Sequence, residues 1–193
     1  MRLVILGPPG AGKGTQATEI TRRLGIPAIS TGDIFRSNVA AGTELGVKVK
    51  GILDSGAYVP DEVTNDLVRD RLSWDDAREG FLLDGYPRTG AQVAELDDIL
   101  ASHDLRLDRV LELTVDTEEV VRRLAARART QGRSDDTEDV IRARLQVYTD
   151  QTEPLTRVYA GRGLLVQVDG LGDVDGVTGR IMAALEVPPR PTS

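Results

Sequence analysis

The chain has 193 residues, 40% of them hydrophobic, and its 24 Lys and Arg against 31 Asp and Glu leave a formal net charge of -7. This length and composition predict one globular domain, and the acidic balance argues against sequence-independent nucleic-acid binding. Because the chain has no cysteine and a single histidine, it has no candidate disulfide, cysteine nucleophile or zinc site.

The lengths of the apolar runs also indicate where in the cell the protein is found. None approaches the roughly 20 residues of a membrane span, and the first run breaks at Gly7, too early for a signal peptide. No segment of the sequence indicates an interface between subunits. We therefore expect a cytoplasmic monomer without a membrane or nucleic-acid partner.

Five short apolar runs predict the strands of a parallel sheet. They are continuously apolar, as strands buried on both faces are. Longer segments with helical spacing separate them, and this alternation predicts right-handed βαβ crossovers and an α/β fold. The runs cover residues 3–6, 26–29, 81–83, 110–115 and 164–168.

A glycine-rich loop lies between the first predicted strand and a helical pattern. Its glycines allow backbone N–H groups to turn inward around a phosphate, the helix N-terminus adds its positive dipole end, and Lys13 supplies a compact charge. Gly14 stands where the general phosphate-loop pattern has Ser or Thr, so the hydroxyl that meets a metal is not assigned. A plain glycine turn is the alternative. The loop reads Gly7-Pro8-Pro9-Gly10-Ala11-Gly12-Lys13-Gly14-Thr15.

The connection between the second and third predicted strands is longer than one crossover needs. Helical spacing over residues 32–41, 44–54 and 61–73 predicts an inserted helical flap. Asp84 then follows the third apolar run, at a strand end expected beside the phosphate loop. A carboxylate there can hold Mg²⁺ through its water shell, and a turn or capping residue is the alternative.

Other features complete the chain. Trp74 closes an amphipathic helical pattern and is predicted to pack rather than to stack on a base. Residues 130–136 form a polar loop before a helix predicted from about Thr137 toward Tyr159. The proline-rich residues 187–193 predict a disordered tail, which leaves a single domain over residues 1–186.

Taken together, four motifs resemble the adenylate kinase family over nearly all of residues 1–186. The resemblance implies a P-loop NTPase-like fold, a five-stranded parallel sheet flanked by helices. It also implies a flap that binds the nucleoside monophosphate at residues 30–59 and a short lid at residues 127–137, without structural zinc. The motifs are the phosphate loop, Ser30-Thr31-Gly32-Asp33, Leu83-Asp84-Gly85-Tyr86-Pro87-Arg88, and Gly132-Arg133-Ser134-Asp135-Asp136 with Arg142-Ala143-Arg144-Leu145.

The activity that this resemblance implies is reversible, Mg²⁺-dependent transfer of the γ-phosphoryl group of ATP to AMP, giving two ADP. Positioning and charge suffice for this step, because the acceptor phosphate is already an anion and needs no general base. By position, the residues that resemble the family's catalytic groups are Lys13, Arg88, Arg127, Arg133 and Arg144.

The same resemblance implies residues for both nucleotides and for the metal. Asp84 and Asp33 are the expected Mg²⁺ residues, acting through water. Those implied for ATP are Gly10, Ala11, Gly12, Lys13, Gly14, Thr15, Arg123, Arg127 and Gly172. Those implied for AMP are Thr31, Arg36, Ala57, Tyr58, Val59, Gly85, Tyr86, Pro87, Arg88, Gln92, Arg133 and Arg144.

Two alternative functions remain. A kinase of the same fold acting on UMP or CMP is the nearer one, although Thr31 follows the adenylate kinase pattern and related pyrimidine kinases tend to carry alanine there. A nucleotide-binding switch or ATPase is the other, and the second cationic site at Arg36 and Arg88 argues against it.

Overall fold

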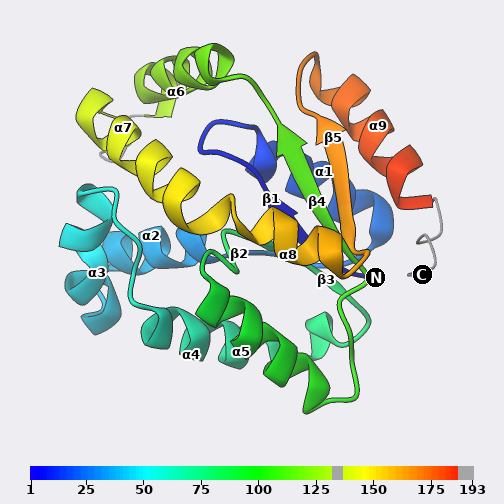
Figure 1. Cartoon of the computed structure of the whole chain (residues 1–193). Coiled ribbons are helices and arrows are strands. Elements are labelled where there is room, and N and C mark those ends of the chain that lie inside the picture. The colour runs from blue at the N-terminus through cyan, green and yellow to red at the C-terminus, as the bar shows by residue number, and fades with distance from the viewer. Residues whose placement is uncertain (132–136, 187–193) are drawn as a thin grey trace.

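A computed structural model describes residues 1–131 and 137–186, with the side chains of residues 128–131 left out. Five parallel strands form one sheet in the order β2-β3-β1-β4-β5, which confirms the predicted α/β fold (Figure 1). The part of the predicted lid at residues 132–136 and the predicted tail lie outside the described residues. The strands are β1 (Arg2–Leu6), β2 (Ala28–Ser30), β3 (Phe81–Asp84), β4 (Arg109–Thr114) and β5 (Leu165–Asp169).

Helices connect the strands and cover both faces of the sheet. In the described part of the chain, no helix is both long enough and apolar enough to cross a membrane. There are also two short elements in the described residues: a 3₁₀ turn, η1, between α4 and β3, and a π turn, η3, between α7 and α8. The helical elements are α1 (Lys13–Leu24), α2 (Thr31–Ala41), α3 (Glu44–Asp54), α4 (Asp61–Leu72), η1 (Asp75–Ala77), α5 (Gly90–Ala101), α6 (Thr117–Gln131), α7 (Glu138–Val147), η3 (Tyr148–Thr152), α8 (Leu155–Gly161) and α9 (Val174–Glu186).

The core consists of two apolar layers, one on each face of the sheet. Along β1, Val4 and Leu6 pack toward α4, α5 and α8, whereas Leu3 and Ile5 pack toward α1 and α9. Successive residues of a strand point to opposite faces, so both sets are buried only when helices cover both sides. This explains why the strands read as unbroken apolar runs.

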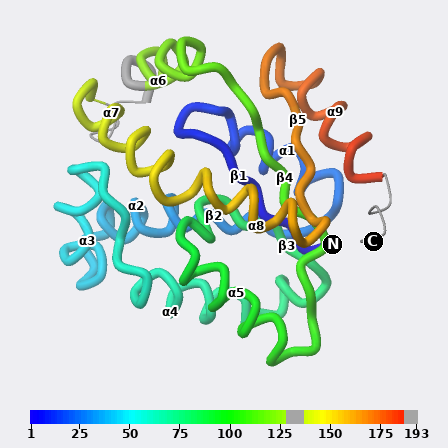
Figure 2. Tube along the Cα trace, viewed as in Figure 1, coloured from blue at the N-terminus to red at the C-terminus, as the bar shows by residue number. Residues whose placement is uncertain are grey.

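Two smaller apolar clusters lie apart from the sheet. Phe35, Val49 and Val59 form one with α2 and α3, and Val120, Leu124 and Ile141 hold α6 to α7. Figure 2 shows these two pairs of helices projecting on the same side of the molecule, beyond the loop that follows β1. Each pair therefore has packing of its own.

The helix predicted from Thr137 toward Tyr159 is wrong as a single element. Pro154 has no N–H, and its ring clashes with the carbonyl four residues earlier, so an ordinary helix is interrupted here. Just before it, the N–H of Glu153 donates to the carbonyl of Tyr148, five residues back, at 2.9 Å. The chain forms α7, the π turn η3 and then α8.

The prediction that Trp74 closes the amphipathic helix before it is also wrong. Trp74 lies beyond the end of α4 and its residue surface is 54% exposed. The guanidinium carbon of Arg71 lies 4.6 Å from the centre of its ring, so its main partner is a cation at the surface. The second strand is also shifted from the predicted residues 26–29 to Ala28–Ser30.

Shortening the buried side chain of Leu83 on β3 tests the core. Leu83 is 0% exposed, so Leu83→Ala should lower the free energy of unfolding by about 3 kcal/mol, through lost burial and the cavity left behind. Leu171→Ala, at a side chain 40% exposed, should change it by less than about 0.5 kcal/mol. Urea denaturation followed by circular dichroism measures both, and equal losses would contradict the assignment of the core.

Candidate nucleotide-binding site

The glycine-rich loop is shaped to leave backbone donors open. It leaves β1 and ends at α1, whose N-terminus no side chain of the described residues caps. At Gly10 the backbone has φ +85°, and a Cβ atom there would lie 2.8 Å from Cγ of Leu124 on α6. Only glycine tolerates both conditions, and the uncapped helix start offers its N–H groups to an anion.

Lys13 is folded back over the loop. Its Nζ donates to the carbonyls of Gly7 and Pro8 at 2.7 and 3.0 Å. Burial is the main cause that lowers the pKa of Lys13 from 10.5 to about 8; nearby arginines contribute to this lowering, and the carboxylate of Asp84 opposes it. The ammonium group therefore lies in a cationic environment that an anionic ligand would relieve.

Asp84 ends β3 directly beside the loop. In the sheet register it lies opposite Ile5 of β1 and Ser30 of β2. Burial raises the pKa of Asp84, and the positive charge of Lys13 acts against this rise. A Cβ atom added at Gly14 would lie 3.8 Å from its Oδ2, which places the carboxylate at the start of α1.

The donors near Asp84 suit a hydrated divalent cation. Asp33 lines the same cavity as Asp84, is exposed and forms an ion pair with Arg36 at 2.5 Å. Among the described residues there is no group of three or more His, Asp or Glu that could enclose a metal ion. One or two carboxylates beside a phosphate site fit Mg²⁺, which keeps most of its water shell.

Two cavities meet at this edge of the sheet. The first, which we call the acceptor cavity, lies against α2 and the residues that follow α3, and the second, the donor cavity, lies against the phosphate loop and α6. The residues expected for AMP that line the acceptor cavity are Thr31, Arg36, Ala57, Tyr58, Val59, Gly85, Pro87, Arg88, Gln92 and Arg144. Those expected for ATP that line the donor cavity are Gly10, Gly12, Lys13, Gly14, Thr15, Arg123 and Arg127.

Among the described residues, four cationic side chains line both cavities. They come from the phosphate loop, from α2, from the loop after β3 and from α7, and they mark where the two cavities join. They are Lys13, Arg36, Arg88 and Arg144.

Three expected contact residues do not line either cavity. Tyr86 is fully buried and its hydroxyl donates to Asn65 Oδ1 on α4 at 2.9 Å, so its side chain belongs to the core. The side chain of Ala11 is likewise buried in the apolar layer around α1. Gly172, which follows β5, lines neither cavity. Arg133, with Asp135 and Asp136, lies outside the described residues.

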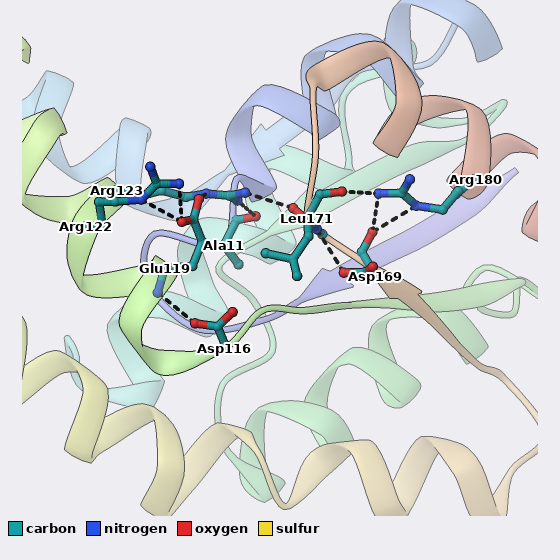
Figure 3. A network of polar contacts seen from close by, with 9 residues as sticks. Ala11, Asp116, Glu119, Arg122, Arg123, Asp169, Leu171 and Arg180 are labelled. Atoms are coloured by element: carbon teal, nitrogen blue, oxygen red, sulfur yellow. Dashed lines mark hydrogen bonds and ion pairs between the residues drawn. The ribbon is translucent and has the colours of Figure 1, made fainter.

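Arg123 joins α6 to the phosphate loop. Figure 3 shows it reaching Ala11 while Glu119, one turn earlier on α6, holds it from the other side. Its guanidinium donates to Glu119 Oε1 at 2.6 Å and to the carbonyls of Ala11 and Gly170 at 3.2 and 3.0 Å. The loop after β5 is held in turn by Arg180, which donates to the carbonyls of Asp169 and Leu171.

Gln92 is held in one orientation by its neighbours. Its Nε2 donates to Asp61 Oδ1 at 2.6 Å, and its Oε1 accepts from the backbone N–H of Arg88 at 2.7 Å. A carboxylate accepts and cannot donate, so Asp61 requires the amide nitrogen on its side. One amide hydrogen and one lone pair of Oε1 remain, the pair that an adenine edge can bind.

Sequence reasoning missed the residues that support the site. Asp61, Glu119 and Thr152 hold Gln92, Arg123 and Arg88 in place, respectively. Glu119 lies four residues before Arg123 on one helix, a spacing that indicates an ion pair. The other two act across long stretches of sequence, and no local pattern marks them.

The parallel sheet, the glycine loop and the strand-end carboxylate define a phosphate-loop nucleotide-binding protein. Comparison with known proteins narrows this class. The family model described as adenylate kinase matches residues 5–164. A protein of Kocuria rhizophila named adenylate kinase is 63% identical over 96% of this chain and 98% of its own length.

Proteins with the same name in Nocardioides sp. and Stenotrophomonas maltophilia are 60% and 51% identical. The matches cover 98% and 96% of this chain, and 99% and 100% of those proteins. The chain therefore belongs to the adenylate kinase family.

The lowered pKa of Lys13 predicts proton uptake when a nucleotide binds. Anionic phosphates favour the charged form, so they should raise the pKa from about 8. Near pH 8 we expect about half a proton taken up per Mg-ATP, and none from this group near pH 6.5, where it is protonated in both states. Calorimetry in buffers of different ionisation enthalpy measures the uptake.

Lys13→Ala is the control for this measurement, because it removes the titrating group while the nucleotide's own protonation stays. It should lack the uptake near pH 8 and should lose at least about a hundredfold in phosphoryl transfer. The same uptake in both proteins would show that another group titrates.

The contact of Asp61 with Gln92 predicts a loss of acceptor recognition. In Asp61→Asn one acceptor oxygen becomes a donor, and Gln92 is no longer forced into one orientation. We expect KM for AMP to rise about tenfold or more, with KM for Mg-ATP unchanged. Asp66→Asn is the matched control, since Asp66 is exposed on the same helix and pairs with Arg69 at the surface. Steady-state kinetics that found the two variants alike would contradict this role.

Proposed function

We infer that this protein transfers the γ-phosphoryl group of Mg-ATP to AMP and forms two ADP in a reversible reaction. The observation that carries this inference is the set of four shared cations, Lys13, Arg36, Arg88 and Arg144, between two adjoining cavities. A protein that only hydrolysed ATP would need one phosphate site. Two adjoining sites with shared charges suit direct transfer between two nucleotides.

The chain's contribution to the reaction is positioning and charge. The acceptor phosphate is already ionised near neutral pH and can attack the γ-phosphorus without a general base. Lys13 and Arg144 are placed to balance the charge that spreads over the transferring group, and Arg88 and Arg36 to hold the acceptor phosphate. Fixing both partners in line converts their encounter into a step within one complex.

Asp84, assisted by Asp33, is the group that we assign to Mg²⁺, through its water molecules. A bound Mg²⁺ would neutralise part of the charge of the ATP phosphates. The carboxylate of Asp84, at the end of β3, lies close to the first turn of α1, which supports this assignment. Thr15 lines the same cavity and is the nearest hydroxyl after Lys13 in the loop.

Adenine selection on the acceptor side rests on Gln92 and Thr31. Gln92 keeps one donor and one acceptor for the base, and the Thr31 hydroxyl donates to the Gly85 carbonyl at 2.9 Å, which fixes the floor of the acceptor cavity. At Gly85 the backbone has φ +81°, and a Cβ atom would lie 2.9 Å from this hydroxyl. Glycine at this position therefore lets the side chains of Thr31 and Arg88 approach the backbone closely.

We also propose that one copy of the chain is sufficient. Every residue named for both cavities comes from the same chain, and the shared cations need no partner subunit to complete them.

The proposed function is tested by comparing acceptors. Initial rates with AMP, UMP, CMP and GMP at fixed Mg-ATP should show AMP as the fastest acceptor, because the free donor and acceptor of Gln92 match the adenine edge. Faster use of UMP or CMP would favour a pyrimidine kinase. Equal ATP hydrolysis with and without any monophosphate would favour an ATPase.

A further inference from the structure

A short chain of contacts joins three distant segments at the acceptor cavity. Tyr58 follows α3, Arg88 follows β3, and Thr152 ends the π turn η3. The hydroxyls of Tyr58 and Thr152 lie 2.8 Å apart, and the Thr152 hydroxyl donates to the backbone carbonyl of Arg88 at 3.0 Å. Thr152 is only 4% exposed, so these contacts are made away from bulk water.

The direction of these hydrogen bonds follows from counting protons. A threonine hydroxyl carries one hydrogen, and a carbonyl can only accept. Thr152 uses its hydrogen on Arg88, so Tyr58 must donate in its contact with Thr152. The chain therefore runs from the Tyr58 hydroxyl through Thr152 to the Arg88 carbonyl.

Tyr58 also contacts Arg88 directly. The guanidinium carbon of Arg88 lies 4.6 Å from the centre of the Tyr58 ring. Arg88 is held further by its Nε, which donates to the Gly85 carbonyl at 2.7 Å, and by its backbone N–H, which donates to Gln92. Within the described residues, hydrogen bonds thus fix the backbone of Arg88 on both sides of its side chain while the ring supports the guanidinium.

We propose that Tyr58 and Thr152 are positioning residues that hold Arg88 ready for the acceptor phosphate before the nucleotide arrives. This rests on the proposed function, in which Arg88 binds that phosphate. A free arginine side chain has many rotamers, and binding must pay for ordering it. When the contacts order it in advance, the gain falls on the acceptor nucleotide and leaves the donor nucleotide unaffected.

The π turn explains how Thr152 reaches this position. Pro154 prevents an ordinary helical turn, and η3 inserts an extra residue into the turn that ends at Thr152. Tyr148, at the other end of η3, lines the acceptor cavity together with Thr152. The irregular turn therefore presents two side chains to the site.

The test is kinetic and uses the full chain. Thr152→Val removes the linking hydroxyl at nearly the same volume, and we expect KM for AMP to rise about three- to tenfold at saturating Mg-ATP, with KM for Mg-ATP unchanged. Thr152→Ser keeps the hydroxyl and should restore KM for AMP. Thr156→Val is the matched control, because within the described residues the Thr156 hydroxyl donates only to the carbonyl of Glu153, just before α8.

Tyr58→Phe separates the hydroxyl from the ring. It should raise KM for AMP less than Thr152→Val does, since the ring still supports the guanidinium. The double variant should be no worse than Thr152→Val alone, because the two hydroxyls act in series. Additive effects, or a KM for AMP within twofold of the original in Thr152→Val, would overturn the proposal.

Two further measurements separate a folding defect, a failure of the proposed function and a failure of the positioning role. Thermal unfolding shows whether Thr152→Val folds, and if it does not, an unchanged KM for AMP in Tyr58→Phe is enough to overturn the proposal. Transfer to AMP by the unaltered protein is measured first. Its absence would refute the proposed function, whereas normal transfer in the original protein and in every variant would refute only the positioning role.

Discussion

Repulsion between two polyanionic nucleotides is the constraint on which the rest of this structure depends. Two unit charges about 4 Å apart near a protein surface repel by about 4 kcal/mol, and two nucleotides in line bring several such pairs together. Positive charge has to converge on one point from several directions. The parallel sheet makes this possible, because the loops at the carboxyl ends of its strands open at the same edge.

The same convergence has a cost in the free protein. Lys13 is buried beside arginines, and its burial, together with their charges, lowers its pKa. Asp84 offsets part of this lowering from the end of the adjacent strand. The two apolar layers on the faces of the sheet supply the stability that holds such a cluster together.

The sequence predicted the features that depend on local order. The glycine loop, the strand that ends at Asp84 and the flap helices α2 and α3 follow from spacing and from residues close to one another. The family resemblance then implied that the arginines converge on the two nucleotides. The predicted bounds of α3 agree with the structure at both ends.

The remaining features depend on contacts between distant segments. Asp61 meets Gln92 across 31 residues, and Thr152 meets Arg88 across 64, so no local pattern could reveal either pair. Pro154 is a local exception, because a proline inside a helical pattern indicates where the helix is interrupted. The helical spacing of the residues before Trp74 predicts that this residue closes the helix, whereas α4 ends before it.

The apolar cluster of α2 with α3 and that of α6 with α7 are separate from the core of the sheet, so local stability differs between parts of the molecule. Each pair of helices can open or rearrange as a local cooperative unit at a free energy well below that of global unfolding. Amide hydrogens in these helices should therefore exchange with solvent through subglobal openings. Those of the central strands should exchange only when the whole chain unfolds. Substitutions within either cluster can thus tune how readily that region opens without endangering the sheet.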